Sequence, residues 1–230
     1  LVGSEMCIRD RMSVTGIALI LFLTFHMSMN IVALFSEKAY NMICAFLGSN
    51  WYAVVATIAL GALTVAHIVY AFILTAQNRS ARGNERYAVN GSSPKVEWAS
   101  KNMLVLGIIV LLGILLHLFN FWYNMMFAEI VGFEGKYSPT AGYSYIVETF
   151  KNPVFVVLYI VWLCAIWYHL SHGFWSAMQT LGINGKIWFK RWKMIGLVYT
   201  TLLMLGFLIV VLAFTFGCAP SLHSACCLIH

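Results

Sequence analysis

Long hydrophobic stretches without a charged side chain alternate with short charged segments along this chain. Each stretch contains at least the roughly 20 apolar residues that a helix needs to cross a bilayer core of about 30 Å. Their apolar residues are continuous and do not alternate with polar ones, which favours helices over the strands of a membrane barrel. The pattern predicts an all-α membrane protein with five transmembrane helices, at about 13–35, 52–77, 102–127, 153–180 and 194–217.

The composition excludes an ordinary soluble domain, because 61% of the 230 residues are hydrophobic and 10% are charged. The net charge of +6 does not indicate a nucleic-acid partner, because the basic residues gather on one side of a five-span topology. Eleven fall on that side: Arg9, Arg11, Arg79, Arg82, Arg86, Lys95, Lys101, Lys186, Lys190, Arg191 and Lys193. Lys38, Lys136 and Lys151 fall on the other. By the positive-inside rule we expect a cytoplasmic N-terminus and an external C-terminus, with the lipid bilayer as the main partner.

Both ends of the chain depart from this pattern. Residues 1–11 do not have the form of a signal peptide, and we interpret them as a non-native leader. The composition changes again over 218–230, a tail of doubtful origin. We therefore expect one membrane domain over 12–217 and leave His223 and His230 out of the functional argument. The six cysteines show no metal-binding spacing.

Four histidines lie deep inside four of the charge-free stretches: His26, His67, His117 and His169. A polar side chain in hydrocarbon is costly, so an intramembrane histidine is a candidate for function. Four is also the number needed to hold two haems by bis-histidine ligation. For any single one of them, a hydrogen-bonded core imidazole or a proton relay is an equally good interpretation.

The depth of each histidine follows from counting residues from the external end of its span. His26 and His117 lie 11 and 12 residues from those ends, whereas His67 and His169 both lie 16 residues away. The difference of 4–5 residues corresponds to about 7 Å along a helix. The count predicts an outer haem held by His26 and His117. It also predicts an inner haem, nearer the cytoplasm, held by His67 and His169.

A fifth histidine, His172, follows His169 by three residues and shares its helix face. The depth match favours His169 as the ligand. His172 lies one turn nearer the cytoplasm, where a haem propionate, a quinone or the backbone can accept its hydrogen bond.

Several stretches around these histidines form a recognisable set: Ser13–Gly16 before His26–Asn30, His67–Phe72 before Asn78–Arg82, Lys101–Gly107 before His117–Trp122, and His169–Gly182. With them the chain resembles, over about 12–217, the five-helix dihaem cytochrome b subunit (b558 type) of bacterial succinate dehydrogenases and fumarate reductases. The stretch that begins at His169 is the most specific. In that family the fourth-helix ligand lies four residues before a glycine, a position that corresponds to His169 before Gly173.

The resemblance implies a membrane anchor that passes electrons between an iron–sulfur subunit and a quinone through two haems b. It further implies that menaquinone is the quinone and that the bacterial cytoplasmic membrane is the location. The dicarboxylate site would belong to flavoprotein and iron–sulfur subunits on the cytoplasmic face, linking respiratory electron transport to the tricarboxylic acid cycle. No catalytic residue is expected in this chain itself.

Two alternatives stay open. One is a dihaem cytochrome b anchor of another respiratory complex, such as a hydrogenase or a formate dehydrogenase. The other is a haem-free, proton-coupled transporter that uses the histidines as a proton relay. Outside the histidines, Glu129 is a candidate for proton exchange with a quinone, against the alternative of a solvated interfacial carboxylate.

Overall fold

The computed structural model of the chain describes residues 2–48, 50–82, 98–133, 135–183, 185–219 and 221. Throughout these residues the regular structure is helical. Five helical stretches are long and apolar enough to cross a membrane: Cys7–Phe35, Trp51–Ala81, Met103–Val131, Pro153–Thr180 and Lys186–Thr215. The predicted all-α architecture with five spans is therefore confirmed for the described part of the chain.

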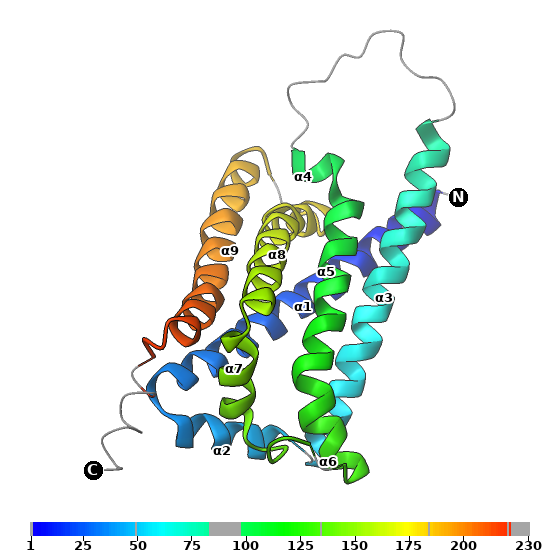
Figure 1. Ribbon diagram of the computed structural model, residues 1–230. Helices are drawn as coiled ribbons and strands as arrows, with labels where there is room; N and C mark the ends of the chain where they lie inside the picture. Colours follow the sequence, from blue (N-terminus) through cyan, green and yellow to red (C-terminus); the bar gives the residue numbers. More distant parts are fainter. Residues whose placement is uncertain are drawn as a thin grey trace, which may run out of the picture.

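Four spans are single helices: α1 (Val2–Phe35), α3 (Trp51–Arg82), α8 (Pro153–Thr180) and α9 (Lys186–Thr215). The remaining span consists of three consecutive segments: α5 (Met103–His117), the π-helix η1 (Leu118–Phe127) and α6 (Ala128–Val131). Three further helices are short: α2 (Glu37–Leu47), α4 (Trp98–Lys101) and α7 (Gly142–Lys151). The start of α1 and the end of α9 lie at opposite ends of the bundle, as an odd number of spans requires (Figure 1).

Helix α8 is the central element, because it packs against α1, α5 and α9. Helix α1 runs obliquely across the bundle and also packs against α3 and α9 (Figure 1). Helix α3 makes its extensive contacts with α1 alone among the described helices. It therefore lies at the edge of the bundle with one main neighbour.

Small residues bring α9 close to its neighbours. A methyl group added at Gly196 would lie 2.7 Å from Cδ1 of Phe174, and one at Gly206 would lie 2.8 Å from Sδ of Met27. Small residues at such contacts are typical of helix packing in membranes, where close approach of the backbones supplies the van der Waals attraction. Helix α9 thus closes the bundle against α8 and α1.

The short helices α2 and α7 form a layer across the end of the bundle opposite the N-terminus (Figure 1). Ser36 caps α2 by accepting a hydrogen bond from the Ala39 N–H at 3.1 Å. The layer is joined by a hydrogen bond of 3.0 Å from the Tyr143 N–H to Oδ1 of Asn41. Much of the buried core lies here, between this layer and the ends of α1, α8 and α9: Ala33, Tyr40, Ile146, Phe150, Val211 and Phe214.

The connection between the predicted third and fourth spans contains the helix α7. The helix forms because Tyr143, Ile146 and Phe150 repeat at the spacing of one helix face and are buried together. Asn152 then ends α7 and caps α8 by accepting from the Val154 N–H at 2.9 Å, with Pro153 at the first helical position. The short segment between these two spans therefore contains an amphipathic helix.

The start of the fifth span also differs from the prediction. Helix α9 begins at Lys186, eight residues before the predicted 194, so Lys190, Arg191 and Lys193 lie within its first turns. Long basic side chains are tolerated at this depth because their charged ends reach back toward the interface. At the other end, the predicted tail is described only for 218, 219 and 221. Its remaining residues, His223 and His230 among them, lie outside the described part.

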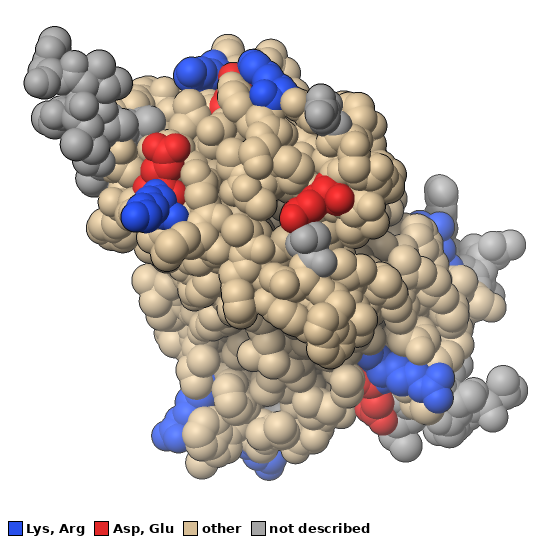
Figure 2. Space-filling view, turned by 90° about the horizontal axis from the view of Figure 1, so that it is seen from below, with Lys and Arg blue, Asp and Glu red and all other residues tan. Residues whose placement is uncertain are grey.

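The surface of the bundle is apolar along the spans. Ile58, Leu112 and Leu202 are 66%, 60% and 64% exposed, as expected for side chains that face lipid. Seen from the end that carries α2 and α7, the molecule is mostly uncharged, and charged side chains stand singly or in small groups (Figure 2). Lys136 and Glu148 form an ion pair on this side.

Candidate functional site

The predicted outer pair of histidines meets between α1 and α5. The ring centres of His26 and His117 lie 5.7 Å apart, and the two ring planes are nearly perpendicular, at 85°. Nδ1 of His117 is buried and has no hydrogen-bond partner among the described residues. Aromatic rings surround the pair, with centres within 6.3 Å of one histidine or the other: Phe22, Phe121, Tyr159, Trp162 and Phe207.

Gly113 makes room for one of these rings. A methyl group at Gly113 would overlap the indole of Trp162, which lies directly against the glycine. The indole also donates from Nε1 to the carbonyl oxygen of Val110 at 3.0 Å. Gly113 and His117 are four residues apart on one helix face, so the glycine places Trp162 beside the His117 ring, 5.7 Å between centres.

The predicted inner pair meets between α3 and α8. The ring centres of His67 and His169 lie 6.4 Å apart with an interplanar angle of 64°. Nδ1 of His169 is buried, and no described residue forms a hydrogen bond with it. On the α5 side the glycine at 107 leaves space, since a methyl group there would lie 3.8 Å from Cε1 of His169.

His67 has a hydrogen-bond partner on α1. Oγ1 of Thr15 lies 3.0 Å from Nδ1 of His67. The next residue is Gly16, where a methyl group would lie 3.4 Å from Cε1 of the same ring. The ring edge of His67 thus rests against α1 at these two positions. Sequence reasoning associated the stretch that contains Thr15 and Gly16 with His26, which follows it in the chain, and so missed this contact.

The two histidine levels both contact α1, at different points along its length. Thr15 contacts His67 and precedes His26 by eleven residues in the same helix, a separation of about 16 Å along α1. The predicted separation of about 7 Å is a difference in depth, which is smaller than a distance measured along a tilted helix. The count took every span to start at one plane and to run parallel to the others, whereas α1 crosses the bundle obliquely (Figure 1).

His172 lies one turn beyond His169 in α8. Its ring packs edge-to-face against Trp175, with centres 4.8 Å apart. Nζ of Lys193 lies over the faces of Trp175 and Phe189, 4.5 and 4.8 Å from their centres. The Lys193 ammonium group near the start of α9 thus makes cation–π contacts with two aromatic rings of the same chain.

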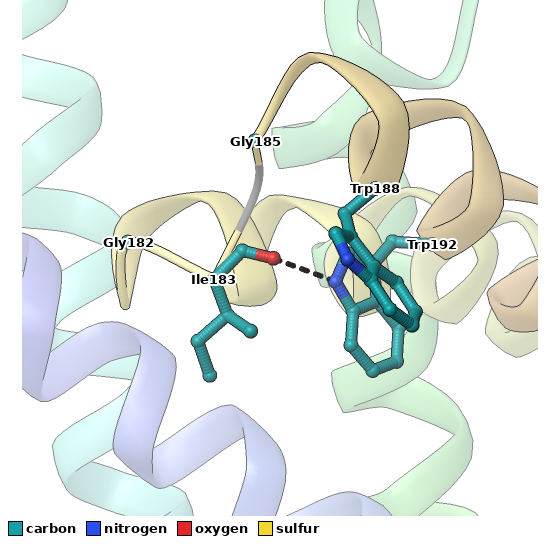
Figure 3. Close-up of a pocket in the computed structure, with 5 residues that line it drawn as sticks. All are labelled: Gly182, Ile183, Gly185, Trp188 and Trp192. Atoms are coloured by element: carbon teal, nitrogen blue, oxygen red, sulfur yellow. Dashed lines mark hydrogen bonds between the residues drawn. The ribbon is translucent and has the colours of Figure 1, made fainter.

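A surface pocket of about 400 Å³ lies at the turn between α8 and α9. Gly182, Ile183, Gly185, Trp188 and Trp192 line it (Figure 3). The Trp192 indole donates from Nε1 to the carbonyl oxygen of Ile183 at 2.7 Å, which fixes one wall (Figure 3). The histidine pairs do not line this pocket.

A second pocket, of about 490 Å³, lies at the opposite end of the bundle beyond α6. Glu129, Lys136 and Tyr137 are among its lining residues. The carboxylate of Glu129 also lies close to α2, since a methyl group at Gly48 would be 2.7 Å from its Oε2. Glu129 is therefore at the interface between α6, α2 and this pocket.

Each histidine pair can supply two ligands to one metal centre. Imidazole nitrogens bind transition metals at about 2 Å, so two rings on opposite sides of one ion have facing nitrogens about 4 Å apart. The ring centres then lie somewhat farther apart, as they do in both pairs. Within the described ranges no cluster of three or more His, Cys, Asp or Glu side chains is placed to hold a bare metal ion.

Two imidazoles per level fit haem iron better than a bare ion. A structural zinc site takes four protein ligands, whereas the porphyrin itself surrounds the iron and leaves the protein to provide axial ligands. The buried Nδ1 atoms of His117 and His169 are compatible with such a group, and the glycines at 16 and 107 let the rings of His67 and His169 lie close to α1 and α5. The chemistry of the donor set thus agrees with bis-histidine haem ligation.

Comparisons of the chain with protein family models, with curated proteins and with solved structures find no match.

Proposed function

We propose that the protein is the dihaem cytochrome b membrane anchor of a bacterial succinate:quinone oxidoreductase, that is, a succinate dehydrogenase or fumarate reductase. The observation that carries the proposal is the meeting of four histidines from four spans in two separate cross-helix pairs. His26 and His117 would hold an outer haem b, and His67 and His169 an inner one. Haem iron, when bound, supplies reversible one-electron redox chemistry within the membrane.

In this proposal the chain holds the two haems, orients their histidine ligands and shields them from water. The aromatic rings around His26 and His117 exclude water from the outer pair. The hydrogen bond between Thr15 and His67 and the contact with Gly16 orient His67 in the inner pair. Helix α3, which has α1 as its one main neighbour among the described helices, gains a second attachment wherever a haem joins His67 to α8.

The resemblance of the sequence supports the choice among dihaem proteins. The most specific stretch runs from His169 through the end of α8 and reaches the turn that forms the pocket in Figure 3. Basic residues gather at this end of the bundle, which by the positive-inside rule is cytoplasmic. We place the flavoprotein and iron–sulfur subunits on this face, and quinone, with menaquinone favoured, as the membrane-soluble partner.

Haem content tests the proposal directly. We expect the purified protein, expressed with ample haem, to show a Soret band and two haems b per chain by the pyridine haemochrome assay. His26→Ala and His117→Ala should each lose one haem, and the double variant should lose no more than either single variant. His67→Ala combined with His26→Ala should lose both, because these residues belong to different pairs. His172→Ala is the matched control and should retain both haems.

Other outcomes of the same experiment separate the competing functions. A protein without haem would contradict the proposal and leave a proton-coupled transporter as the better explanation of the histidines. Two haems per chain, with no flavoprotein or iron–sulfur protein retained on mild purification from the native membrane, would point to another respiratory complex. Loss of a haem in His172→Ala but not in His169→Ala would show that His172, and not His169, is the ligand.

A further inference from the structure

Thr15 is buried in α1, and its hydroxyl lies between its own helix and His67. Its Oγ1 is 3.0 and 2.9 Å from the carbonyl oxygens of Arg11 and Met12, and 3.0 Å from Nδ1 of His67. A hydroxyl has one hydrogen to donate and two lone pairs with which to accept. Helical threonines commonly donate that hydrogen to a carbonyl three or four residues earlier. The oxygen then accepts, and Nδ1 of His67 must be the donor.

From this geometry we infer that Thr15 is the positioning residue of the inner haem, holding His67 as the tautomer with its hydrogen on Nδ1. The lone pair is then on Nε2, the nitrogen left to bind iron. This inference rests on the proposed function and adds to it a residue that is not a ligand. The adjacent Gly16 supports it, since the ring edge lies against the helix backbone there and has little freedom to turn.

The arrangement makes the two inner ligands unequal. His67 is tethered through Nδ1, whereas Nδ1 of His169 is buried without a hydrogen-bond partner in the described structure. A hydrogen bond accepted from Nδ1–H increases the basicity of the imidazole as a metal ligand. A more basic ligand stabilises ferric over ferrous iron, so Thr15 should lower the reduction potential of the inner haem relative to a variant without the hydroxyl.

Removal of this single hydroxyl tests the inference. Thr15→Val keeps the shape of the side chain, Thr15→Ser keeps the hydroxyl, and Thr64→Val is the control. Thr64 lies on α3 one turn before His67, but its hydroxyl donates to the carbonyl oxygen of Leu60 at 2.9 Å. The purified dihaem protein is titrated redox-potentiometrically in its α-band, and the ferric haems are examined by electron paramagnetic resonance.

In Thr15→Val we expect about a tenfold change in the reduction equilibrium constant of one haem, or about 59 mV upward for one electron. The low-spin ferric signal of that haem should shift as its ligand ring reorients. The affected haem should be the one that His67→Ala removes, and the other haem should keep its potential. Selective loss of that haem is the stronger form of the same result. Thr15→Ser and Thr64→Val should match the unaltered protein.

An unchanged inner-haem potential and signal in Thr15→Val would overturn the inference, as would an equal shift in Thr15→Ser or in Thr64→Val. If Thr15→Val does not accumulate in the membrane, Thr15→Ala removes the same hydroxyl with a smaller side chain and is judged by the same criteria. These failures leave two haems in the unaltered protein. Failure of the proposed function is distinct, because the unaltered protein would then bind no haem.

Discussion

At the scale of single residues, the close contact between Gly113 and the indole of Trp162 constrains the outer histidine pair. Gly113 has Trp162 lying directly on it, and the indole is held further by its hydrogen bond to Val110. A rigid ring cannot move aside as a flexible side chain can, so an added methyl group must displace the ring or part the two helices. Either change would displace the His117 ring, which packs on the same indole.

We therefore predict that Gly113→Ala destabilises the protein by about 1–3 kcal/mol, the usual cost of overpacking a well-packed core. The outer haem should be weakened and the inner one retained. Thermal unfolding in detergent, followed by circular dichroism and by the Soret band, measures both effects. Gly61→Ala is the control, because a methyl group there meets nothing within 4 Å. Equal unfolding temperatures for the two variants would show that the contact with Trp162 does not constrain the bundle.

The pairing of the four histidines was partly predictable from the sequence, because their depth in the membrane can be estimated by counting residues. The count put His26 with His117 and His67 with His169, and these are the rings that lie together. The distance between the levels stays a prediction, since residue counts contain no information on helix tilt. The contact of Thr15 with His67 was equally invisible, because it joins positions 52 residues apart on helices whose relative rotation the sequence does not show.

The membrane-spanning helices were predictable because hydrophobicity alone is enough to identify them. All five spans follow from length and composition. Helices α2 and α7 lie outside the predicted spans because they have 11 and 10 residues, too few to cross a bilayer, and a search for spans does not detect them. The π-helical segment η1 directly after His117 was missed as well, since its residues, LFNFWYNMMF, carry no sign of i→i+5 hydrogen bonding.

The layer formed by α2 and α7 depends on one side-chain to backbone hydrogen bond that the sequence did not reveal. We predict that Asn41→Ala lowers the stability of the protein by about 1–3 kcal/mol, because it leaves the N–H of buried Tyr143 without its partner. Denaturation in mixed detergent micelles measures the change. Asn50→Ala is the matched control, since its exposed amide donates to the carbonyl oxygen of Phe46 in the preceding helix. Equal losses in the two variants would contradict a special role for the layer.

On the scale of the whole molecule, the five spans place the turn between α8 and α9 at one end and the C-terminal end of α9 at the other (Figure 1). Cys218 follows α9 by three residues. The positive-inside rule assigns the first end to the cytoplasm, since the basic residues around α9 and the ends of α1 and α3 lie there. Both positions are open to reagents. A side chain at Gly185 meets nothing within 4 Å, and the thiol of Cys218 is exposed.

We predict that a membrane-impermeant maleimide labels Cys218 in intact spheroplasts, in a variant whose other cysteines are replaced. A Gly185→Cys variant without other cysteines should be labelled only after the membrane is opened, because the proposed orientation places its thiol in the cytoplasm. Cys44 as the single cysteine is the internal control, since burial raises the pKa of its thiol to about 11 and leaves little reactive thiolate at neutral pH. Labelling of Gly185→Cys in intact spheroplasts would reverse the orientation and, with it, the side on which the partner subunits are placed.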